Sequence, residues 1–297
     1  MPFTASHIAA VLPLTRAPLV ASALVIGSMT PDLPYFVPLP VGAPMTHSLL
    51  GVVSVDVLLG LAVFVVWHGL LVRPALAAAP ASLRERLSAD AVRRLRSRLA
   101  SLRGLLVVSV SLAVGALTHV AWDAFTHEGA WGTERVAWLI ASEGAFPGYK
   151  WAQYASGVVG ALVVAIWLAR WWRRTAGPAV EAGLRATPEL PRTGAKQPAA
   201  VAGLPRTGAE LPEAATRLST RVAAGAWLAI GLAGVVAAAV ASWAPLTVRG
   251  GPYLRDAAVV AVTHGIAFAG LMTVILAASW HCAAAFRRVD RRDVAPG

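Results

Sequence analysis

The sequence predicts an all-α membrane protein, a polytopic helical bundle of about five transmembrane helices plus an N-terminal half-helix. The first observation is composition: of 297 residues, 57% are hydrophobic and only 14% are charged, and the mean hydropathy is +0.63. Such values are typical of integral membrane proteins. The second and third are long apolar runs and basic residues gathered between them. The single cysteine, Cys282, leaves neither a disulfide framework nor a cysteine metal site.

Five apolar stretches are long enough to cross a bilayer, which takes about 20 helical residues. They lie at about 48–72, 104–126, 154–172, 222–243 and 257–281. A sixth stretch, Ala17 to Met29, is too short and is bounded by Arg16 and Pro31. We expect it to be a half-helix, either re-entrant or packed against the other helices. We expect no cleavable signal peptide, because Pro13 interrupts the apolar run that precedes Arg16, the first basic residue.

The positions of Lys and Arg predict the orientation in the membrane. Most of the 26 basic residues lie in segments 73–103 and 170–221 and in the C-terminal tail. Cytoplasmic loops carry such an excess, so we expect these three segments in the cytoplasm. The five spans then alternate without conflict. The net charge of +11 is explained by this topology and by anionic lipid, so we expect no nucleic-acid partner.

Residues 175–220 divide the chain. They are rich in Pro, Gly, Ala and Thr, and the segment 190–195 recurs almost unchanged at 204–209. This composition predicts a disordered cytoplasmic linker, in which the repeat is either a docking motif or a neutral expansion. The linker separates a membrane core with a His/Asp site, residues 1–174, from a C-terminal transmembrane hairpin and basic tail, residues 221–297.

Ionisable side chains gather on one predicted side of the membrane. His119, Asp123 and His127 are four residues apart, which places them on nearly one face of a helix. They end an apolar run, where ionisable groups are expensive and need a reason to be present. The predicted topology adds four more groups on the outer side or at the outer ends of spans: His7, Asp32, His47 and His264.

Each of these residues also has a structural explanation. His7 could lie at a polar helix start, and Asp32, between two prolines, could be a turn residue or a cap. His47 could lie in the first helical turn after Thr46 as N-cap. His264 could make a polar contact between helices. His127 is the weakest candidate of the triplet, because a position in water explains it equally well. Asp56, inside the first predicted span, fits a buried hydrogen bond, for example to His264. The structural explanations compete well at each residue but less well for the set.

Histidine and aspartate without cysteine favour a divalent ion with nitrogen and oxygen ligands, such as Zn²⁺, Mn²⁺ or Fe²⁺. Such an ion lowers the pKa of a bound water toward neutrality. Glu128 is a candidate general base, although it points about 100° away from His127 on a helix. The sequence has no Gly-rich phosphate loop and no Gly-x-Ser-x-Gly elbow, so it gives little support to serine catalysis.

At these residues the sequence resembles a bacterial integral-membrane family called domain of unknown function 4184. The likeness covers about residues 1–172 and is carried by segments 1–14, 27–32, 46–51 and 119–127 and by Tyr149, Lys150, Gln153 and Tyr154. The order of an early His, Pro-Asp, Thr-His-Ser and His-x-x-x-Asp is similar to membrane-bound metal-dependent hydrolases, whose His/Asp pattern resembles zinc-dependent phospholipase C.

The resemblance implies a set of metal ligands and a location. The ligands are His7, Asp32, His47, His119 and Asp123, with His127 added by position. The location is the bacterial plasma membrane, and the distribution of Lys and Arg predicts that the site lies on its extracytoplasmic side. Those hydrolases often carry a His-Arg shortly before Thr-His-Ser, whereas this chain has residues 41–45, Val-Gly-Ala-Pro-Met. This departure leaves a second metal position or a phosphate-binding arginine without support.

Three function hypotheses follow, and the sequence does not decide whether the protein is an enzyme. The leading one is a membrane-bound metal-dependent hydrolase with zinc as the expected metal and His119 and Asp123 as catalytic residues. Its partners are membrane lipid and a phosphoester or lipid-borne ester substrate at the outer face. The second is a non-catalytic membrane scaffold or envelope-associated protein, in which the His/Asp set is scattered. The third is a small transporter with Asp56 and His264 as a proton relay, although five spans without an inverted repeat argue against it.

Overall fold

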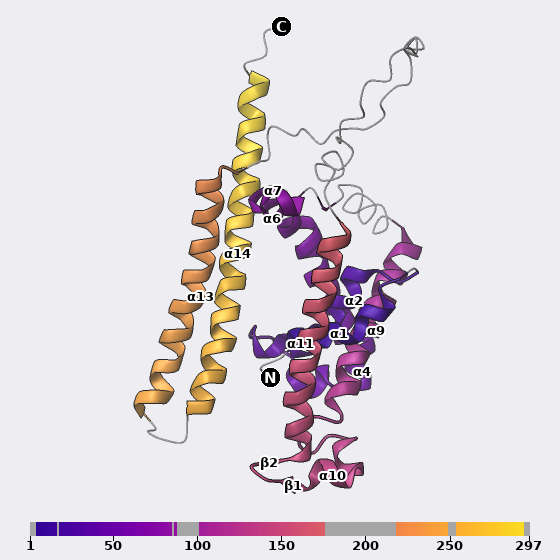
Figure 1. The fold of residues 1–297 in the computed structure, drawn as a ribbon. Helices are drawn as coiled ribbons and strands as arrows, with labels where there is room; N and C mark the ends of the chain where they lie inside the picture. Colours follow the sequence, from indigo (N-terminus) through magenta and orange to yellow (C-terminus); the bar gives the residue numbers. More distant parts are fainter. Residues whose placement is uncertain are drawn as a thin grey trace, which may run out of the picture.

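The computed structural model describes residues 4–16, 18–84, 86–87, 101–175, 218–248 and 254–293, which are almost entirely helical. Five helices are long and apolar enough to cross a membrane (Figure 1). They are Val55–Ala78, Leu102–Asp123, Gly148–Arg174, Thr220–Ser242 and Ala257–Ala285. The predicted all-α multi-pass bundle is therefore confirmed. The predicted linker 175–220, with its repeat, lies almost wholly outside the described residues.

Short helices occupy the first fifty residues because proline repeatedly interrupts the chain. They are η1 (Thr4–His7), α1 (Ile8–Val11), η2 (Leu12–Leu14), α2 (Ala21–Gly27), η3 (Thr30–Tyr35), α3 (Ala43–Thr46) and α4 (Leu49–Val53). The helix α2 is the expected half-helix, and three of its seven residues are buried. It packs against the other helices, chiefly α9.

The first span begins later than its composition predicts. The backbone turns sharply at Ser54, with φ −123° and ψ −83°, and separates α4 from α5 (Val55–Val65). The span continues through a π-helical turn, η4 (Val66–Leu71), into α6 (Val72–Ala78). The predicted start at residue 48 is wrong because the apolar composition continues through this turn. Asp56 therefore lies in the first turn of the spanning helix and not deep within it.

The remaining elements are regular. They are α7 (Ala81–Arg84), α9 (Leu102–Asp123), η5 (Thr133–Arg135), α10 (Ala137–Ile140), α11 (Gly148–Arg174), α13 (Thr220–Val248) and α14 (Leu254–Asp293). Between α10 and α11, β1 (Ser142–Glu143) pairs antiparallel with β2 (Phe146–Pro147), and Ser142 faces Pro147. The side chain of Ser101 caps α9 by accepting a hydrogen bond from the Gly104 amide at 3.1 Å.

The buried core lies where α2, α5 and α9 meet. Its fully buried side chains are Val20, Ala23, Phe64, Val108 and Leu112. Two glycines let α2 and α9 approach backbone to backbone. A Cβ on Gly27 would overlap the carbonyl of Leu112, and one on Gly115 would overlap the carbonyl of Leu24. Small residues allow this kind of close helix crossing in membrane proteins.

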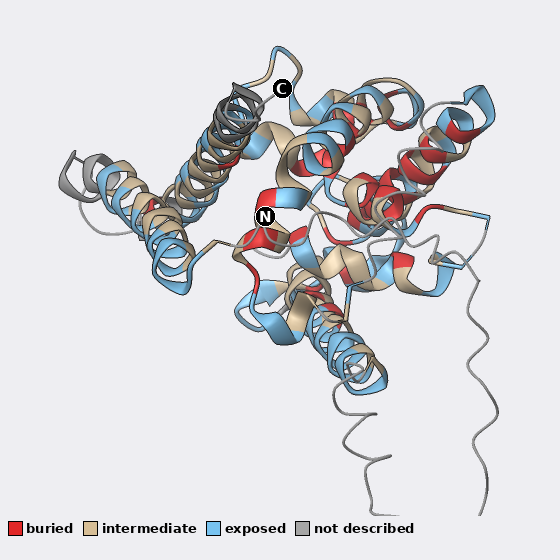
Figure 2. Ribbon diagram, turned by 90° about the horizontal axis from the view of Figure 1, so that it is seen from above, coloured by how far each residue is buried: buried red, intermediate tan, exposed pale blue. Residues whose placement is uncertain are grey.

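The hairpin of α13 and α14 touches the rest of the chain mainly at α6 and η4. Its polar links there are from the His281 ring to the carbonyl of Leu70, at 3.0 Å, and from Trp227 to the carbonyl of Ala78, at 3.4 Å. Most of its described side chains are exposed or partly exposed (Figure 2). This exposure fits helices whose apolar faces meet lipid.

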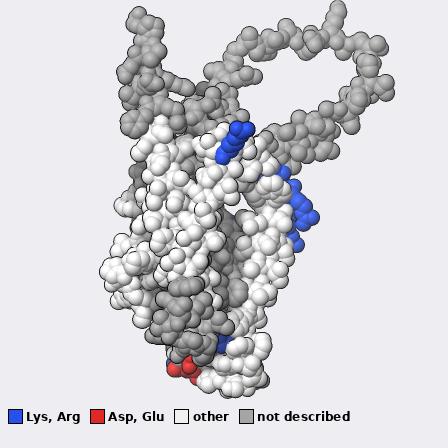
Figure 3. Space-filling model, turned by 90° about the vertical axis from the view of Figure 1, so that its left-hand side faces the viewer, with Lys and Arg blue, Asp and Glu red and all other residues white. Residues whose placement is uncertain are grey.

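Charge is unevenly distributed between the two ends of the bundle. On the face in Figure 3, most Lys and Arg atoms lie towards one end and the Asp and Glu atoms lie at the other. The acidic end carries α10 and the β1–β2 pair, and the opposite end carries α6 and α7. This asymmetry agrees in direction with the positive-inside rule. The orientation itself stays a prediction.

Candidate metal centre

Four acidic and imidazole side chains from different parts of the chain converge at one point. They are Asp32, His47, His119 and Asp123, and each offers one donor atom within 4.8 Å of the others. Asp32 comes from η3, His47 follows α3, and His119 and Asp123 lie on the last turns of α9. A metal site requires this degree of convergence, because ligands sit about 2.0–2.2 Å from the ion.

The separations of the donor atoms match the edges of a coordination tetrahedron. Asp32 Oδ1 lies 3.6 Å from His47 Nε2 and 3.5 Å from His119 Nε2. Asp123 Oδ2 lies 3.5 Å and 3.3 Å from the same two nitrogens. The edge of a regular tetrahedron is roughly 1.6 times its centre-to-vertex distance, so zinc ligands lie about 3.3–3.6 Å apart. Four of the six edges therefore have the length that one ion requires.

These same four atoms lack hydrogen-bond partners among the described residues. Asp32 Oδ1, His47 Nε2, His119 Nε2 and Asp123 Oδ2 are all buried and unsatisfied. Two protonated imidazoles paired with two carboxylates would instead form charge-assisted hydrogen bonds of about 2.7–2.9 Å. The observed gaps are too long for such bonds. A shared cation satisfies all four atoms at once.

The other nitrogen of each imidazole is held by the backbone. His119 Nδ1 donates to the carbonyl of Ser28 at 2.8 Å, and His47 Nδ1 donates to the carbonyl of Ala43 at 3.0 Å. A carbonyl can only accept, so each Nδ1 carries a proton. In the neutral ring this leaves the Nε2 lone pair free for a metal. The backbone thus sets both tautomers and both ring orientations.

The glycine crossing of the core explains why the Ser28 carbonyl reaches His119. Gly115 is one turn before His119 on α9, and its missing side chain admits the segment Gly27–Ser28. The α2 helix ends at Gly27, and the carbonyl of the next residue, Ser28, accepts the hydrogen bond from His119. The packing of two apolar helices therefore fixes the direction of a ligand.

The ligand Asp32 has a dedicated partner. Thr4 donates from Oγ1 to Asp32 Oδ2 at 2.6 Å, which leaves Oδ1 facing the cluster. The carboxylate is fully buried in the 3₁₀ segment η3. Burial alone would raise the pKa of Asp32, but His119, His47 and Thr4 outweigh it and hold the pKa well below its usual range. The carboxyl group is therefore ionised, as a ligand must be.

Thr46 links the His47 and Asp32 segments. Its Oγ1 donates to the carbonyl of Pro31 at 2.8 Å, so the turn before His47 is tied to the residue before Asp32. Burial opposes charge on the His47 ring, but Asp123 and Asp32 outweigh it and raise the pKa of His47 to about 9. The metal-free site therefore holds a proton on His47 at neutral pH.

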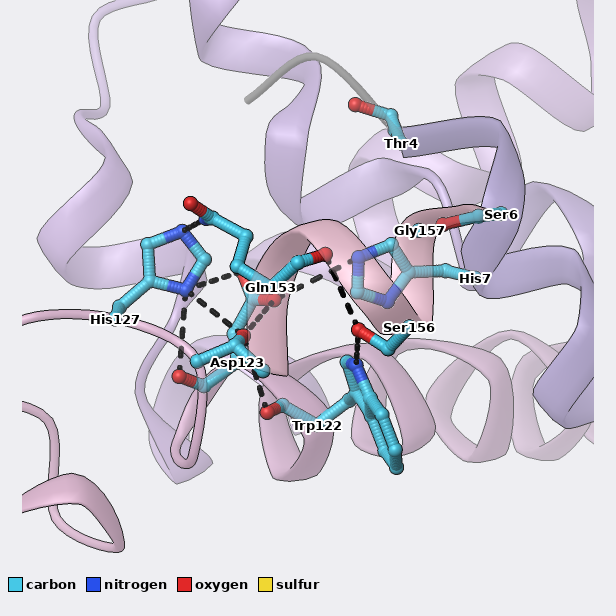
Figure 4. Close-up of a pocket in the computed structure, with 10 residues that line it drawn as sticks. Thr4, Ser6, His7, Trp122, Asp123, His127, Gln153, Ser156 and Gly157 are labelled. Carbon is cyan, nitrogen blue, oxygen red and sulfur yellow. Dashed lines mark hydrogen bonds and ion pairs between the residues drawn. The ribbon is translucent and has the colours of Figure 1, made fainter. Parts of the chain in front are cut away.

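His7 and His127 flank Asp123 outside the four-atom group (Figure 4). The ring of His7 stacks on His119 with centroids 3.9 Å apart, and its Nε2 is 3.6 Å from Asp123 Oδ1. His127 Nδ1 lies 3.5 Å from Asp123 Oδ2, and Gln153 donates to its Nε2 across 3.0 Å. Burial lowers the pKa of both histidines, that of His7 to about 4. Both rings are therefore neutral at physiological pH.

Two cavities meet at Asp123. The smaller, of ≈ 20 Å³, has room for about one water and is lined by His7, Asp123, His127 and Gln153 among others. The larger, of ≈ 690 Å³, is mainly apolar and reaches His47, Asp123 and His127. A site that opens onto space in this way resembles a catalytic metal centre more than a closed structural one.

Other residues singled out by sequence lie elsewhere. The exposed His264 bonds the carbonyl of Val260 in its own helix at 2.9 Å. Asp56 is buried, and its two carboxylate oxygens have no hydrogen-bond partner among the described residues. The structure thus gives no Asp56–His264 pair. Glu128 accepts a hydrogen bond from Tyr149 at 3.2 Å and is not a member of the cluster.

Sequence reasoning missed the residues that support the ligands. Thr4, Thr46 and Gln153 each bond a site residue or its segment. Thr4 and Thr46 lie within three residues of the histidines His7 and His47. That proximity and the family resemblance, which includes Gln153, are the signals in the sequence, and neither says which atom each side chain bonds.

The chain matches the family described as "Domain of unknown function (DUF4184)" over residues 1–285. It therefore belongs to that family, as the motifs of the first 172 residues predict. The match extends through most of the C-terminal hairpin, well beyond the likeness seen in the sequence. No curated protein and no solved structure matches the chain.

Proposed function

We propose that this protein is a membrane-bound metal-dependent hydrolase whose centre is formed by Asp32, His47, His119 and Asp123. The observation that carries the proposal is the convergence of four buried, unsatisfied donor atoms with separations of 3.3–3.6 Å. A scaffold whose His/Asp set is scattered does not predict this convergence.

The donor set favours zinc. Two imidazole nitrogens and two carboxylate oxygens suit Zn²⁺ at tetrahedral spacing, and Mn²⁺ and Fe²⁺ accept the same ligands. A bound ion would supply Lewis-acid chemistry by polarising an ester oxygen and acidifying water. His119 and Asp123 act in this proposal by holding the ion.

The two neutral histidines beside Asp123 supply the proton chemistry. In the proposed hydrolysis, the oxygen of a water forms a bond to phosphorus or an acyl carbon, and the bond to the leaving oxygen breaks. One proton of the water ends on the leaving oxygen. His7 lines the water-sized cavity next to Asp123, so its free imidazole is placed to accept and return that proton.

The substrate class follows from the position of the centre. Asp123 is the last residue of the spanning helix α9, so the centre lies near one end of the membrane-spanning helices. A phosphoester or other ester carried by a lipid places its polar group at this depth. The charge asymmetry of the chain puts this end on the extracytoplasmic side in our proposal.

Metal analysis of protein purified in detergent tests the proposal. We expect about one equivalent of Zn²⁺, Mn²⁺ or Fe²⁺ per chain, falling below about 0.2 in His119→Ala and in Asp123→Asn. His264→Ala is the matched control because His264 is exposed and bonds only its own helix among described residues. Its metal content should equal that of wild type.

Hydrolysis is then measured with p-nitrophenyl phosphate diesters. Turnover that depends on added metal and is lost in His119→Ala supports a hydrolase. A metal-free wild type, or equal metal in all variants, contradicts the centre. A loaded centre with no turnover of phosphate diesters or carboxyl esters contradicts the hydrolase while keeping the metal site.

A further inference from the structure

The larger cavity has two chemically different ends. Its polar end reaches His47, Asp123 and His127. The rest of the lining is chiefly apolar and includes Leu49, Leu117 and Val120, with Tyr35 and Trp131 also present. At ≈ 690 Å³ the cavity falls within the range of about 300–1,000 Å³ typical of small-molecule sites.

One face of α9 forms a continuous apolar path to the site. Leu117, Val120, Ala121 and Ala124 all line the cavity, and their spacing of three and four residues places them along one stripe of the helix. Asp123 and His127 stand at the end of that stripe. The same helix therefore supplies both a ligand and the wall that leads to it.

Several residues of the cavity wall are exposed on the surface of the bundle. Leu117, on the spanning helix α9, is 45% exposed, and Leu49, in α4 shortly before the first span, is 72% exposed. Trp131 is 62% exposed and Tyr35 43%, and such aromatic residues favour the membrane–water interface. An exposed apolar wall on a spanning helix would give a lipid access to the cavity from the bilayer.

We propose that this cavity binds the hydrocarbon chain of an amphiphilic ester and presents its ester group to the His/Asp centre. The inference rests on the proposed hydrolase and names its substrate class as a long-chain lipid ester or phosphoester. The chain lies along Leu117, Val120 and Ala121, and the ester lies against His47 and Asp123. A purely polar substrate leaves the apolar wall without a function.

The hydrocarbon chain of the substrate gains little binding free energy when it leaves lipid for the cavity wall, since both surroundings are equally apolar. The cavity therefore contributes mainly position, by holding the ester at the depth of the centre. Holding the ester next to the His/Asp centre raises the rate of turnover as well as the affinity. Substrates that lack a long chain should be insensitive to the shape of the cavity.

The test uses two probes with one reactive group, ethyl and hexadecyl p-nitrophenyl phosphate. Ala121→Phe narrows the cavity at an exposed position on α9. We expect it to lower kcat/KM for the hexadecyl probe at least about tenfold more than for the ethyl probe, because only the hexadecyl chain needs the full length of the wall. Ala161→Phe is the matched control, an exposed alanine on α11 that lines neither cavity, and should change neither probe.

A second measurement does not depend on activity. A hexadecyl phosphate with a diazirine in its chain is photolysed with the metal-free protein, and the labelled peptides are mapped. We expect labelling between Leu117 and Trp131, reduced by Ala121→Phe and unchanged by Ala161→Phe. Labelling confined to α13 and α14, or an equal loss for both probes in Ala121→Phe, overturns the proposal. If neither probe is hydrolysed, the hydrolase fails and the labelling alone decides whether the cavity binds a chain.

Discussion

The membrane core and the C-terminal hairpin use helices in opposite ways. The core interrupts its helices repeatedly, with 3₁₀ segments at Thr4–His7 and Thr30–Tyr35 and a break at Ser54. The hairpin consists of two long helices, which approach closely at Gly234 and Gly265. Both regions cross the membrane by the same criteria of length and composition.

The difference shows where irregular structure is needed. An uninterrupted helix can offer ligands only from one face, as α9 does with His119 and Asp123. Asp32 and His47 come from short segments that end beside α9. In this core, two of the four donors come from interrupted segments, which are absent from the described residues of the hairpin. Irregular backbone at membrane depth is tolerated where protein buries it.

The largest expected effect comes from closing the space between α2 and α9. Gly115→Ala places a methyl group on the carbonyl of Leu24 and near the Ser28 amide, and such overpacking costs about 1–3 kcal/mol of folding stability. It also moves the Ser28 carbonyl away from His119, so metal should be lost. Unfolding by SDS titration and metal analysis check both effects.

The hairpin supplies the matched control for this substitution. A Cβ on Gly231 meets no atom within 4 Å among the described residues. Gly231→Ala should therefore leave metal content unchanged and stabilise the helix by up to about 1 kcal/mol. Equal destabilisation by both substitutions would remove the distinction between the two regions.

Metal binding in the core should strengthen as the pH rises. His47 has a raised pKa of about 9 without metal, so an ion must displace its proton below that pH. We expect the affinity for Zn²⁺ to increase about tenfold per pH unit between about pH 7 and 9. Competition with a chelating dye at each pH measures this slope, and His47→Ala should flatten it.

The same proton on His47 stabilises the metal-free fold, so the folding stability of metal-free protein should fall as the pH rises, whereas metal affinity increases. A raised pKa means that protonated His47 stabilises the folded state. This contribution is fully present below the ordinary value of 6.5 and is lost as the pH rises through about 9. Metal-free protein should therefore become less stable over that window, whereas loaded protein should not.

For the metal-binding prediction, an affinity for Zn²⁺ that stays constant between about pH 7 and 9 would show that His47 does not bind the ion.

The smallest expected effect tests the support of Asp32. Thr4→Val removes the 2.6 Å hydrogen bond to Asp32 Oδ2 and leaves the ligand atom in place. Loss of such a partner typically lowers metal affinity about 10- to 100-fold, and we expect the lower end. Thr273→Val is the control, since this hairpin hydroxyl bonds only the carbonyl of Ala269 among described residues. An unchanged affinity in Thr4→Val would mean that Oδ2 does not orient the ligand.

The sequence predicts the helical spans well because composition decides them. All five predicted spans agree with the structure at their core, and the half-helix at Ala21–Gly27 is confirmed. The early start predicted for the first span is wrong because Ser54 changes the backbone direction without changing hydropathy. Periodicity also places His119 and Asp123 together, since they share one helix face.

The rest of the site depends on contacts between segments distant in sequence. The tie from Thr46 to Pro31 and the bond from His119 to Ser28 join residues 15 and 91 positions apart. No local pattern specifies them. The family motifs name Asp32 and His47, but only the crossing at Gly27 and Gly115 explains how they reach α9. The placement of His7 and His127 outside the four-atom group likewise needs coordinates.

X-ray absorption at the zinc edge of zinc-loaded protein measures the ligands of the ion itself. We predict four nitrogen and oxygen ligands at about 2.0–2.1 Å, with the outer-shell scattering of two imidazoles. His119→Ala should remove one imidazole or the metal itself, and His264→Ala should leave the spectrum unchanged. A six-oxygen hydrated ion, a sulfur ligand, or a protein that takes up no zinc would contradict a centre formed by Asp32, His47, His119 and Asp123.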